Sequence, residues 1–161
     1  MSKESTADLY ADPNNSIGYL TRIAFRNFSR ALERRTAPHG VTAGQWRFLR
    51  VLWREEGLTQ RELSRRVGMR EPTTVTALKS LERSGFVVRR QSAEDRRKTH
   101  VYLTPEARAL RETLAPCIAE VNEIALAGLT EDEVLTLRRL LQHVGRNLAP
   151  EVDDVSSDAP V

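Results

Sequence analysis

Cysteine is almost absent from this sequence of 161 residues, since Cys117 is the only one. A single thiol cannot form a disulfide within one chain, and no cluster of cysteine and histidine has the spacing of a zinc site. The histidines, too, lie far apart along the chain, at His39, His100 and His143. These absences exclude a disulfide scaffold and argue against a metal enzyme, and we expect neither a metal nor another cofactor.

Long apolar runs are also missing. No segment approaches the ~20 apolar residues that a membrane span needs. The first residues, MSKESTADLYADPNN, have no apolar core and include acidic side chains, so they predict neither a secretory signal nor a transit peptide. Hydrophobic residues make up 40% and charged residues 29% of the chain, as is usual in globular proteins. We therefore expect a cytoplasmic protein of one domain, or of one small domain with helical extensions.

Basic residues are concentrated in the middle of the chain. Residues 47–98 contain 14 Lys and Arg against 7 Asp and Glu, whereas the remainder contains 11 against 15. A basic segment between neutral or acidic flanks is typical of a nucleic-acid-binding surface. A solvated basic face would give the same balance, so the motifs must decide between the two.

Helical periodicity dominates both ends of the chain. Apolar residues recur at three- and four-residue steps over 16–37, 105–127 and 130–148, as on one face of an amphipathic helix. Residues 1–14 lack this periodicity, and we expect them to form a flexible arm. The last residues, 149–161, are acidic and contain Ser, Ala and Pro, which predicts a disordered tail.

Three capping boxes mark helix starts, at Thr42-Ala-Gly-Gln45, Thr59-Gln-Arg-Glu62 and Thr130-Glu-Asp-Glu133. The first box opens a helix that buries Trp46, Leu49, Leu52 and Trp53. The second opens a short helix with Leu58, Leu63 and Val67 inward. After a tight turn, Glu71-Pro72 starts another helix, because proline suits the first helical position.

The segments FVVRR at 86–90 and THVYL at 99–103 are rich in β-branched and aromatic residues and enclose a polar, charged stretch. They predict a β-hairpin with a long basic tip. Helix, short turn, helix and hairpin follow in the order of a winged helix-turn-helix, although two short helices could also form a plain helical hairpin. We therefore predict a mainly α fold with a small β-hairpin wing.

The outer face of the helix at 72–84 distinguishes these two alternatives. On a helical wheel of ~100° per residue, Val75, Leu78 and Leu81 cluster on one side, joined by Thr74. The other side has no acidic residue, whereas a solvated face usually mixes Glu with Lys. Its side chains can reach base edges, thymine methyl groups and phosphates in a major groove. The candidate DNA contacts here are Arg70, Thr73, Thr76, Ala77, Lys79, Ser80 and Arg83.

The hairpin tip, Glu94-Asp95-Arg96-Arg97-Lys98, places three cations at a projecting turn, and Arg89 and Arg90 lie on the strand that leads to it. An arginine at such a tip can enter a narrow, electronegative minor groove. Asp95 would repel a phosphate. We expect it to hold Arg97 or Arg96 extended through a charge-assisted pair, and we count Lys98 among the DNA contacts.

The run LTQRELSRRVGMREPTTVTALKSLERSGFVVRRQSAEDRRKTHVYLTPEARAL resembles the MarR family of bacterial and archaeal regulators. The resemblance rests on the leucine-rich first helix, the T-V-x-x-L-x-x-L-E-x-x-G pattern, Asp95 with Arg97 in the wing, and Leu103-Thr-Pro. With the flanking helices it covers about residues 15–148. It implies a sequence-specific regulator that binds double-stranded DNA, by family habit as a repressor.

The resemblance also implies a homodimer in which the first helix and the last two interleave with those of the partner. The helices at 16–37 and 105–127 are indeed too long to bury all their apolar residues against a three-helix core. We expect a winged helix-turn-helix domain at 41–103 and a helical dimerisation domain from both chain ends, 15–40 and 104–148. A monomer with a folded-back helical cap is the alternative. Candidate interface residues are Ile17, Leu20, Leu126, Leu137, Leu140, Val144 and Leu148.

Family members commonly bind small aromatic acids, and the resemblance implies that such an acid or its thioester releases the protein from a pseudo-palindromic operator. An arginine beside aromatic rings can take a carboxylate. Candidate ligand residues are Tyr19, Arg22, Phe25, Arg26, His39, Trp46 and Trp53. Tryptophans at helical spacing are also typical of a core, and the arginines of a solvated surface.

Some family members sense oxidants through a cysteine near the start of the first helix. This chain departs from that pattern, and we expect Cys117 to be a small packed residue.

Three other classes of protein remain for comparison. An enzyme would need a catalytic triad, a glycine-rich phosphate loop or metal-ligand spacing, none of which is recognisable here, so we expect no enzymatic activity. A non-specific architectural binder of DNA or RNA would share the basic segment but would not need the groove-facing helix. A helical protein-interaction module would not need the cations of the wing.

Overall fold

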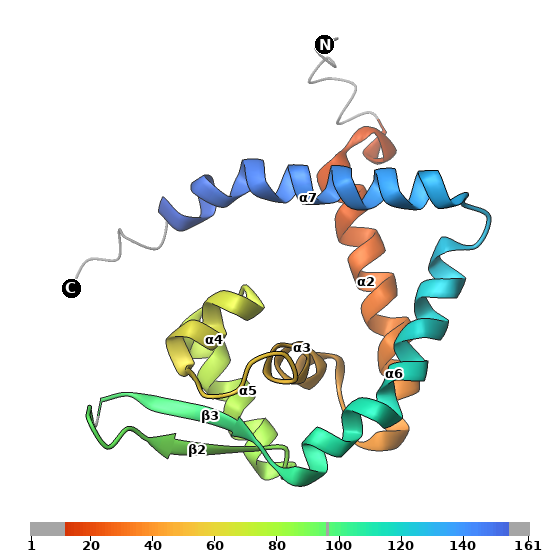
Figure 1. The fold of residues 1–161 in the computed structure, drawn as a ribbon. Helices are drawn as coiled ribbons and strands as arrows, with labels where there is room; N and C mark the ends of the chain where they lie inside the picture. The colour runs from red at the N-terminus through yellow and green to blue at the C-terminus, as the bar shows by residue number, and fades with distance from the viewer. Residues whose placement is uncertain (1–11, 96, 155–161) are drawn as a thin grey trace. The chain divides into compact units, whose positions relative to one another are not determined.

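The structure is a computed structural model that describes residues 12–95 and 97–154. The chain divides into two compact units, residues 1–121 and 122–161. The fold is mainly helical with a small antiparallel sheet, which confirms the expected fold class (Figure 1). No helix in the described ranges has both the length and the apolarity to cross a membrane.

The order of elements follows the predicted plan of helix, helix-turn-helix, hairpin and long helices. The first part of the chain contains η1 (Pro13–Asn15), α2 (Ile17–Thr36), η2 (Ala37–His39) and α3 (Ala43–Leu52). The central part contains β1 (Leu58–Thr59), α4 (Gln60–Val67), α5 (Glu71–Arg83), β2 (Val87–Gln91) and β3 (Thr99–Leu103). The last part contains α6 (Pro105–Leu126) and α7 (Glu131–Asp154).

All three predicted capping boxes are formed. At the start of α3, Gln45 N donates to Thr42 Oγ1 at 3.2 Å, and Thr42 N donates to Gln45 Oε1 at 3.1 Å. The same reciprocal bonds start α4 and α7, at Thr59 with Glu62 and at Thr130 with Glu133. These bonds satisfy backbone N–H groups that have no partner within the helix. In the last two boxes the threonine hydroxyl also donates to the carboxylate. The hydroxyl bond is the main reason that the pKa of Glu62 is lowered, whereas the backbone bond is the main reason for Glu133.

The sheet contains the predicted hairpin and one strand that the sequence did not reveal. Its order is β1-β3-β2, with Val87 opposite Leu103 in the hairpin and Leu58 opposite Val101 at the added strand. Leu58 was expected inside the following helix and is buried in β1 instead. A strand of two residues is too short to show alternation, so only its pairing with β3 identifies it.

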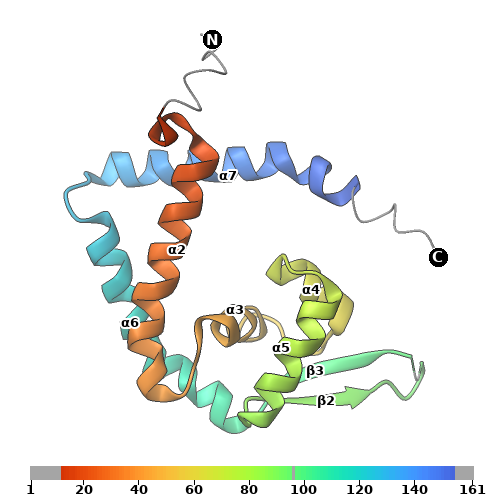
Figure 2. The ribbon, with the colours of Figure 1, turned by 180° about the vertical axis from the view of Figure 1, so that it is seen from behind.

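The core of the first unit lies between the sheet and helices α3, α4 and α5, which gather on one side of the hairpin (Figures 1 and 2). It is built mainly from Leu and Val, with Phe48 at its centre. Trp46 and Trp53 meet edge to face with ring centroids 5.3 Å apart. The indole of Trp53 donates to the carbonyl of Ala107 at 2.7 Å, which joins α3 to the first turns of α6.

Two expectations about the chain ends are wrong in part. Residues 13–15 form a 3-10 helix, because Asp12 Oδ1 accepts from Asn14 N at 2.9 Å and caps it. Helix α7 continues to Asp154, so residues 149–154 are helical and not part of a disordered tail. Pro150 lies in the last turns of this helix, where its missing N–H removes only one backbone bond. Residues 1–11 and 155–161 lie outside the described residues.

The carboxylate of Glu56, in the turn after α3, joins three elements. It accepts from the backbone N–H of Leu103, at the end of β3, at 3.0 Å. Arg108 in α6 donates to both of its oxygens, through Nε at 2.7 Å and Nη2 at 2.8 Å. The bond to Arg108 is the main reason that the pKa of Glu56 is lowered, while partial burial works in the opposite direction. The base of the wing and the start of α6 are thus held by one charged group.

Replacing Glu56 by Gln is expected to lower the free energy of unfolding at neutral pH, because Arg108 loses its charged partner. Since the folded-state pKa of Glu56 is lowered, its ionic contribution is complete above the pKa of an unfolded glutamate, about 4.3. That contribution disappears as the pH falls through the lower folded-state value. Urea titrations at several pH values check whether the stability difference between wild type and Glu56→Gln shrinks below about pH 4.

Glu55→Gln is the control for this comparison. Its carboxylate pairs with Arg66 at a more exposed site, where its side chain is 48% exposed, so its loss should change stability much less. A difference for Glu56→Gln that stays constant from neutral to acid pH would contradict the assignment.

Candidate nucleic-acid interface

The exposed side of α5 is the first part of the candidate surface. Thr73, Thr76, Lys79 and Arg83 are exposed on it and are called the reading face here. The opposite side of the helix is fixed in the core by Thr74, Leu78 and Leu81, each fully buried. The helix begins at Glu71-Pro72, preceded by Arg70, which is also exposed. The burial pattern therefore presents hydroxyl, methyl and cationic groups to the outside.

Ser80 and Ala77 differ from the rest of the residues expected on this face. Gln45, buried at the start of α3, donates from Nε2 to Ser84 Oγ at 2.9 Å and to Ser80 Oγ at 3.3 Å. Ser80 is therefore turned towards α3, and Ala77 packs against the core. A helical wheel places Ser80 on the outer face and Ala77 at its margin, and only the packing of neighbouring elements turns both towards the interior.

The wing tip, residues 92–98, is closed by its own polar groups. Ser92 Oγ accepts from the N–H groups of Glu94 and Asp95, each at 3.2 Å. Asp95 Oδ1 accepts from Arg97 N at 3.0 Å and from Arg97 Nε at 3.3 Å. Both bonds favour the ionised carboxylate and lower the pKa of Asp95, the backbone bond most. The side chain of Arg97 is 92% exposed, so Asp95 supports it from one side only.

The strand that leads to the tip carries two arginines with different surroundings. The guanidinium of Arg90 lies 5.2 Å from the ring centroid of Tyr102 on an exposed part of the hairpin. That of Arg89 pairs with Glu82 at 2.7 Å and is half-buried. Arg89 was expected to contact DNA, but its guanidinium is turned towards α5. Lys98 is exposed at the end of the tip, and Arg96 lies outside the described residues.

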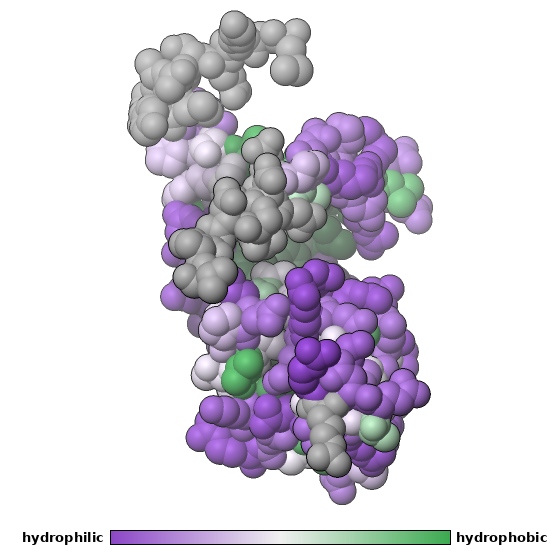
Figure 3. All heavy atoms as spheres, turned by 90° about the vertical axis from the view of Figure 1, so that its left-hand side faces the viewer, coloured by the Kyte–Doolittle hydropathy of each residue, from purple (hydrophilic) through white to green (hydrophobic). Residues whose placement is uncertain are grey.

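The surface formed by these elements is predominantly hydrophilic. Figure 3 views the molecule from the side of the wing tip, and its lower part shows mostly polar and charged residues with a few separate apolar ones. Within residues 12–95 and 97–154, no group of three His, Cys, Asp or Glu side chains could hold a metal ion. Cys117 is half-buried against the core, with Sγ 3.8 Å from the carbonyl oxygen of Arg35.

The seven candidate ligand residues differ in their burial and in their partners. Trp46 is buried and packs on Trp53, while His39 is exposed in η2, beyond the end of α2. The guanidinium of Arg22 lies 5.2 Å from the ring centroid of Tyr19. Arg26 is exposed on the same helix.

Phe25 has a partner that the sequence did not indicate. The guanidinium of Arg47, from α3, lies 4.8 Å from the centroid of its ring. Arg47 could not be recognised from the sequence, because no local motif relates a residue of α3 to one of α2.

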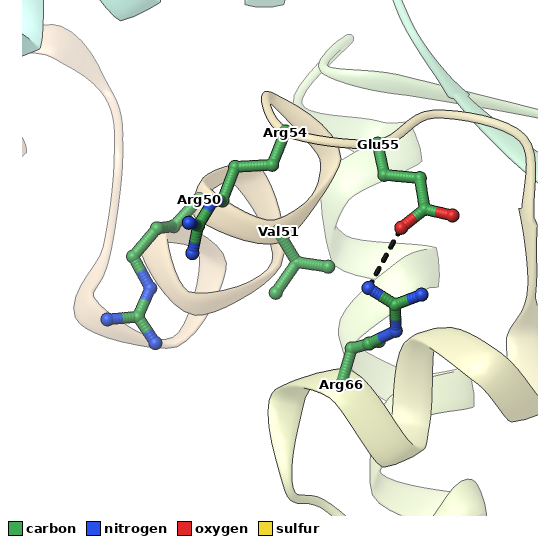
Figure 4. A pocket seen from close by; sticks show the side chains of 5 residues that line it. All are labelled: Arg50, Val51, Arg54, Glu55 and Arg66. Carbon is green, nitrogen blue, oxygen red and sulfur yellow. Dashed lines mark ion pairs between the residues drawn. The ribbon is translucent and has the colours of Figure 1, made fainter. Parts of the chain in front are cut away.

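A hollow of about 540 Å³ lies where α3 ends, beside α4 (Figure 4). It is lined by Arg50, Val51, Arg54, Glu55 and Arg66. Arg66 Nη1 pairs with Glu55 Oε2 at 2.8 Å. Three guanidinium groups and one carboxylate give the hollow a net positive charge, and guanidinium groups are well shaped to bind carboxylates and phosphates. Its arginines come from α3, the turn after α3, and α4, so no local pattern in the sequence marks this site.

Comparisons with known proteins relate the chain to transcriptional regulators. A model of the MarR family matches residues 39–98. The HTH-type transcriptional regulator TtmR of Methylorubrum extorquens (strain PA1) is 35% identical over 120 residues, which are 74% of this chain and 60% of TtmR. The chain therefore spans less than two thirds of the length of that relative.

The matches with solved structures extend over almost the whole length of the matched chains. A probable transcriptional regulator from Pseudomonas aeruginosa is similar with a TM-score of 0.74 and 32% identity, over 83% of this chain and 99% of its own. A MarR transcriptional regulator from Methanosarcina mazei Go1 is similar with a TM-score of 0.76 and 27% identity, over 81% of this chain and 94% of its own.

Proposed function

The chain belongs to the MarR family of transcriptional regulators, and we propose that it represses transcription by binding an operator in double-stranded DNA. The observation that carries the proposal is the exposed reading face of α5 beside a wing tip whose Arg97 is 92% exposed. Members of this family are regulators and not enzymes. A repressor acts where the chromosome is, so the proposal includes the cytoplasm.

Each part of the surface suits a different groove of DNA. A major groove of ~12 Å admits α5, whose Thr73 and Thr76 offer hydroxyl and methyl groups to base edges. Lys79 and Arg83 can neutralise phosphates on either side. Arg97 at the tip is placed to enter a minor groove, where negative potential is greatest over A·T tracts. The affinity should therefore fall steeply as salt rises.

Arg97→Ala is expected to weaken operator binding by more than about tenfold, because it removes one extended cation and its groove contact. The operator is first obtained by selecting bound fragments from genomic DNA, and affinity is then measured by mobility shift. Arg22→Ala, which removes an exposed arginine from α2, is the matched control. Unchanged binding by Arg97→Ala would refute a role for the wing.

Competition with random duplex in the same assay separates a specific regulator from a non-specific architectural binder. A specific regulator keeps its operator against a large excess of competitor.

We further propose that the protein acts as a homodimer. Helix α7 presents an apolar stripe at alternating steps of three and four residues, which is the spacing of a helix-pairing seam. The stripe consists of Val134, Leu137, Leu141, Val144 and Leu148, and all of these except the half-buried Val134 are exposed in the single chain. Ile17 and Leu20 of α2 and Leu140 are exposed as well, whereas Leu126 is half-buried. A two-fold dimer would place two reading helices on half-sites about 10 base pairs apart.

Val144→Glu is expected to shift the mass measured by light scattering at micromolar concentration from dimer towards monomer, because it places a charge in the proposed seam. Leu135→Glu is the matched control, since Leu135 is 56% exposed on another side of the same helix. A monomer mass for the wild type, or the same loss in both variants, would contradict the proposed interface.

A small aromatic acid or its thioester is the proposed effector. Two features of α3 support an acid: Arg47 lies over the ring of Phe25, and Arg50 and Arg54 line the hollow beside α4. Both tryptophans belong to the core, so they leave recognition of the acid to these arginines. An acid that prefers one arrangement of the reading domains would shift the population that binds DNA.

Benzoate, salicylate and benzoyl-coenzyme A are expected to raise the melting temperature of the wild type and to release it from its operator. The double substitution Arg50→Ala with Arg54→Ala should reduce both effects, because it removes two guanidinium groups from the hollow. Benzamide, which lacks the carboxylate, is the control for benzoate and salicylate, and free coenzyme A is the control for the thioester. If none of the three compounds moves the melting temperature, the effector proposal fails while the DNA-binding proposal stands.

A further inference from the structure

Arg89 faces the interior of the DNA-binding domain and not its outer surface. In β2, Val87 is buried and Val88 exposed, so the alternation of the strand puts Arg89 on the inner side with Val87. There Arg89 Nη2 lies 2.7 Å from Glu82 Oε2, and Arg89 Nη1 donates to Gln60 Oε1 at 3.4 Å. The side chains of Arg89 and Glu82 are 28% and 31% exposed, which shields their contact from much of the solvent.

These contacts join three elements at one point. Glu82 is in the last turn of α5, Gln60 is the first residue of α4, and Arg89 is in the strand that leads to the wing tip. The chain itself joins α5 to β2 through a short turn, in which Phe86 N donates to Leu81 O at 2.9 Å. That turn fixes where the strand begins, whereas the contact at Arg89 lies three residues further along it and fixes its direction.

We propose that Glu82, Arg89 and Gln60 form a brace that sets the angle between the reading face and the wing tip. On this view Arg89 is a positioning residue that does not contact DNA. The inference rests on the proposed function, since the angle matters only if both parts bind one duplex. Two linked contacts strengthen each other only while their geometry allows both to engage at once. The planar guanidinium suits this task because it holds two acceptors in a fixed fork.

The first test compares Arg89→Gln with Lys79→Gln, each of which removes one positive charge. A cation that contacts phosphate contributes about 0.9 to the slope of log affinity against log salt. Arg89→Gln is expected to weaken operator binding about tenfold with an unchanged slope, because no contact with DNA is lost. Lys79→Gln is expected to lower the slope by about 0.9. A similar fall in slope for Arg89→Gln would make Arg89 a DNA contact and overturn the brace.

The second test exchanges the charges of the brace. Glu82→Arg and Arg89→Glu are each expected to weaken operator binding, because each places like charges together. The double variant restores an opposite pair and should recover most of the lost affinity. If the double variant binds the operator no more tightly than the single variants, the proposal is overturned. Unchanged operator affinity in Arg89→Gln would overturn it as well.

Thermal unfolding of each variant identifies any that fail to fold, and Arg89→Gln keeps the first test valid if the charge reversals do. If the wild type binds no operator, the proposed function fails and the brace with it. If the wild type binds and the variants disagree with these expectations, only the brace fails.

Discussion

A partly buried carboxylate must keep its partners, and the one at Glu56 ties the DNA-binding domain to the helix that follows it. Its bonds to Leu103 and Arg108 join the turn after α3, the end of β3 and the start of α6. The indole of Trp53 reaches the same part of α6 at Ala107. If either oxygen of Glu56 lost its partner, the desolvation of that oxygen would no longer be compensated, and the folded state would be destabilised. The first turns of α6 and the base of the wing are therefore constrained to move together.

This constraint offers a route by which a ligand in the hollow beside α3 could affect the wing. Two of the hollow's three arginines, Arg50 and Arg54, lie at and just after the end of α3, shortly before Glu56 in the chain. A ligand that shifted this end of α3 would act directly on the turn that holds Glu56. The displacement could then pass to β3, and so to the wing, without any change in the reading face. The start of α3 offers a second connection, because Gln45 bonds to Ser80 in α5 and to Ser84 at the end of that helix.

Features with local causes could be predicted from the sequence, and features caused by distant contacts could not. Each capping box involves residues three apart, and all three formed as expected. The hairpin was equally clear from its β-branched segments. By contrast, β1 depends on pairing with β3, and the inward position of Arg89 depends on Glu82. Val87 and Val88 are alike in the sequence, so the alternation that places Arg89 inward is seen only in the folded strand.

Part of the positive charge in residues 47–98 is paired with carboxylates of the same domain. Arg66 and Arg89 pair with Glu55 and Glu82, and Arg61 lies 3.7 Å from Glu71. The half-buried pair of Arg89 and Glu82 joins β2 to α5, whereas the other two pairs are exposed and contribute little to stability. The charge balance of a segment is therefore a guide to a class of protein, while the role of each arginine depends on the carboxylates that folding brings to it.

The wing tip separates the residue that shapes the turn from the residue that projects from it. The shorter bond of the Asp95 carboxylate is to the backbone N–H of Arg97, a group that every amino acid except proline possesses. A different side chain at position 97 would leave that bond in place, whereas a different one at position 95 would remove it and leave the turn with its backbone bonds and those of Ser92. Mutation can thus exchange the projecting group in single steps without loss of the folded tip. Over evolutionary time, such a tip lets descendants of one ancestral regulator diverge in the DNA they prefer while they keep the same scaffold.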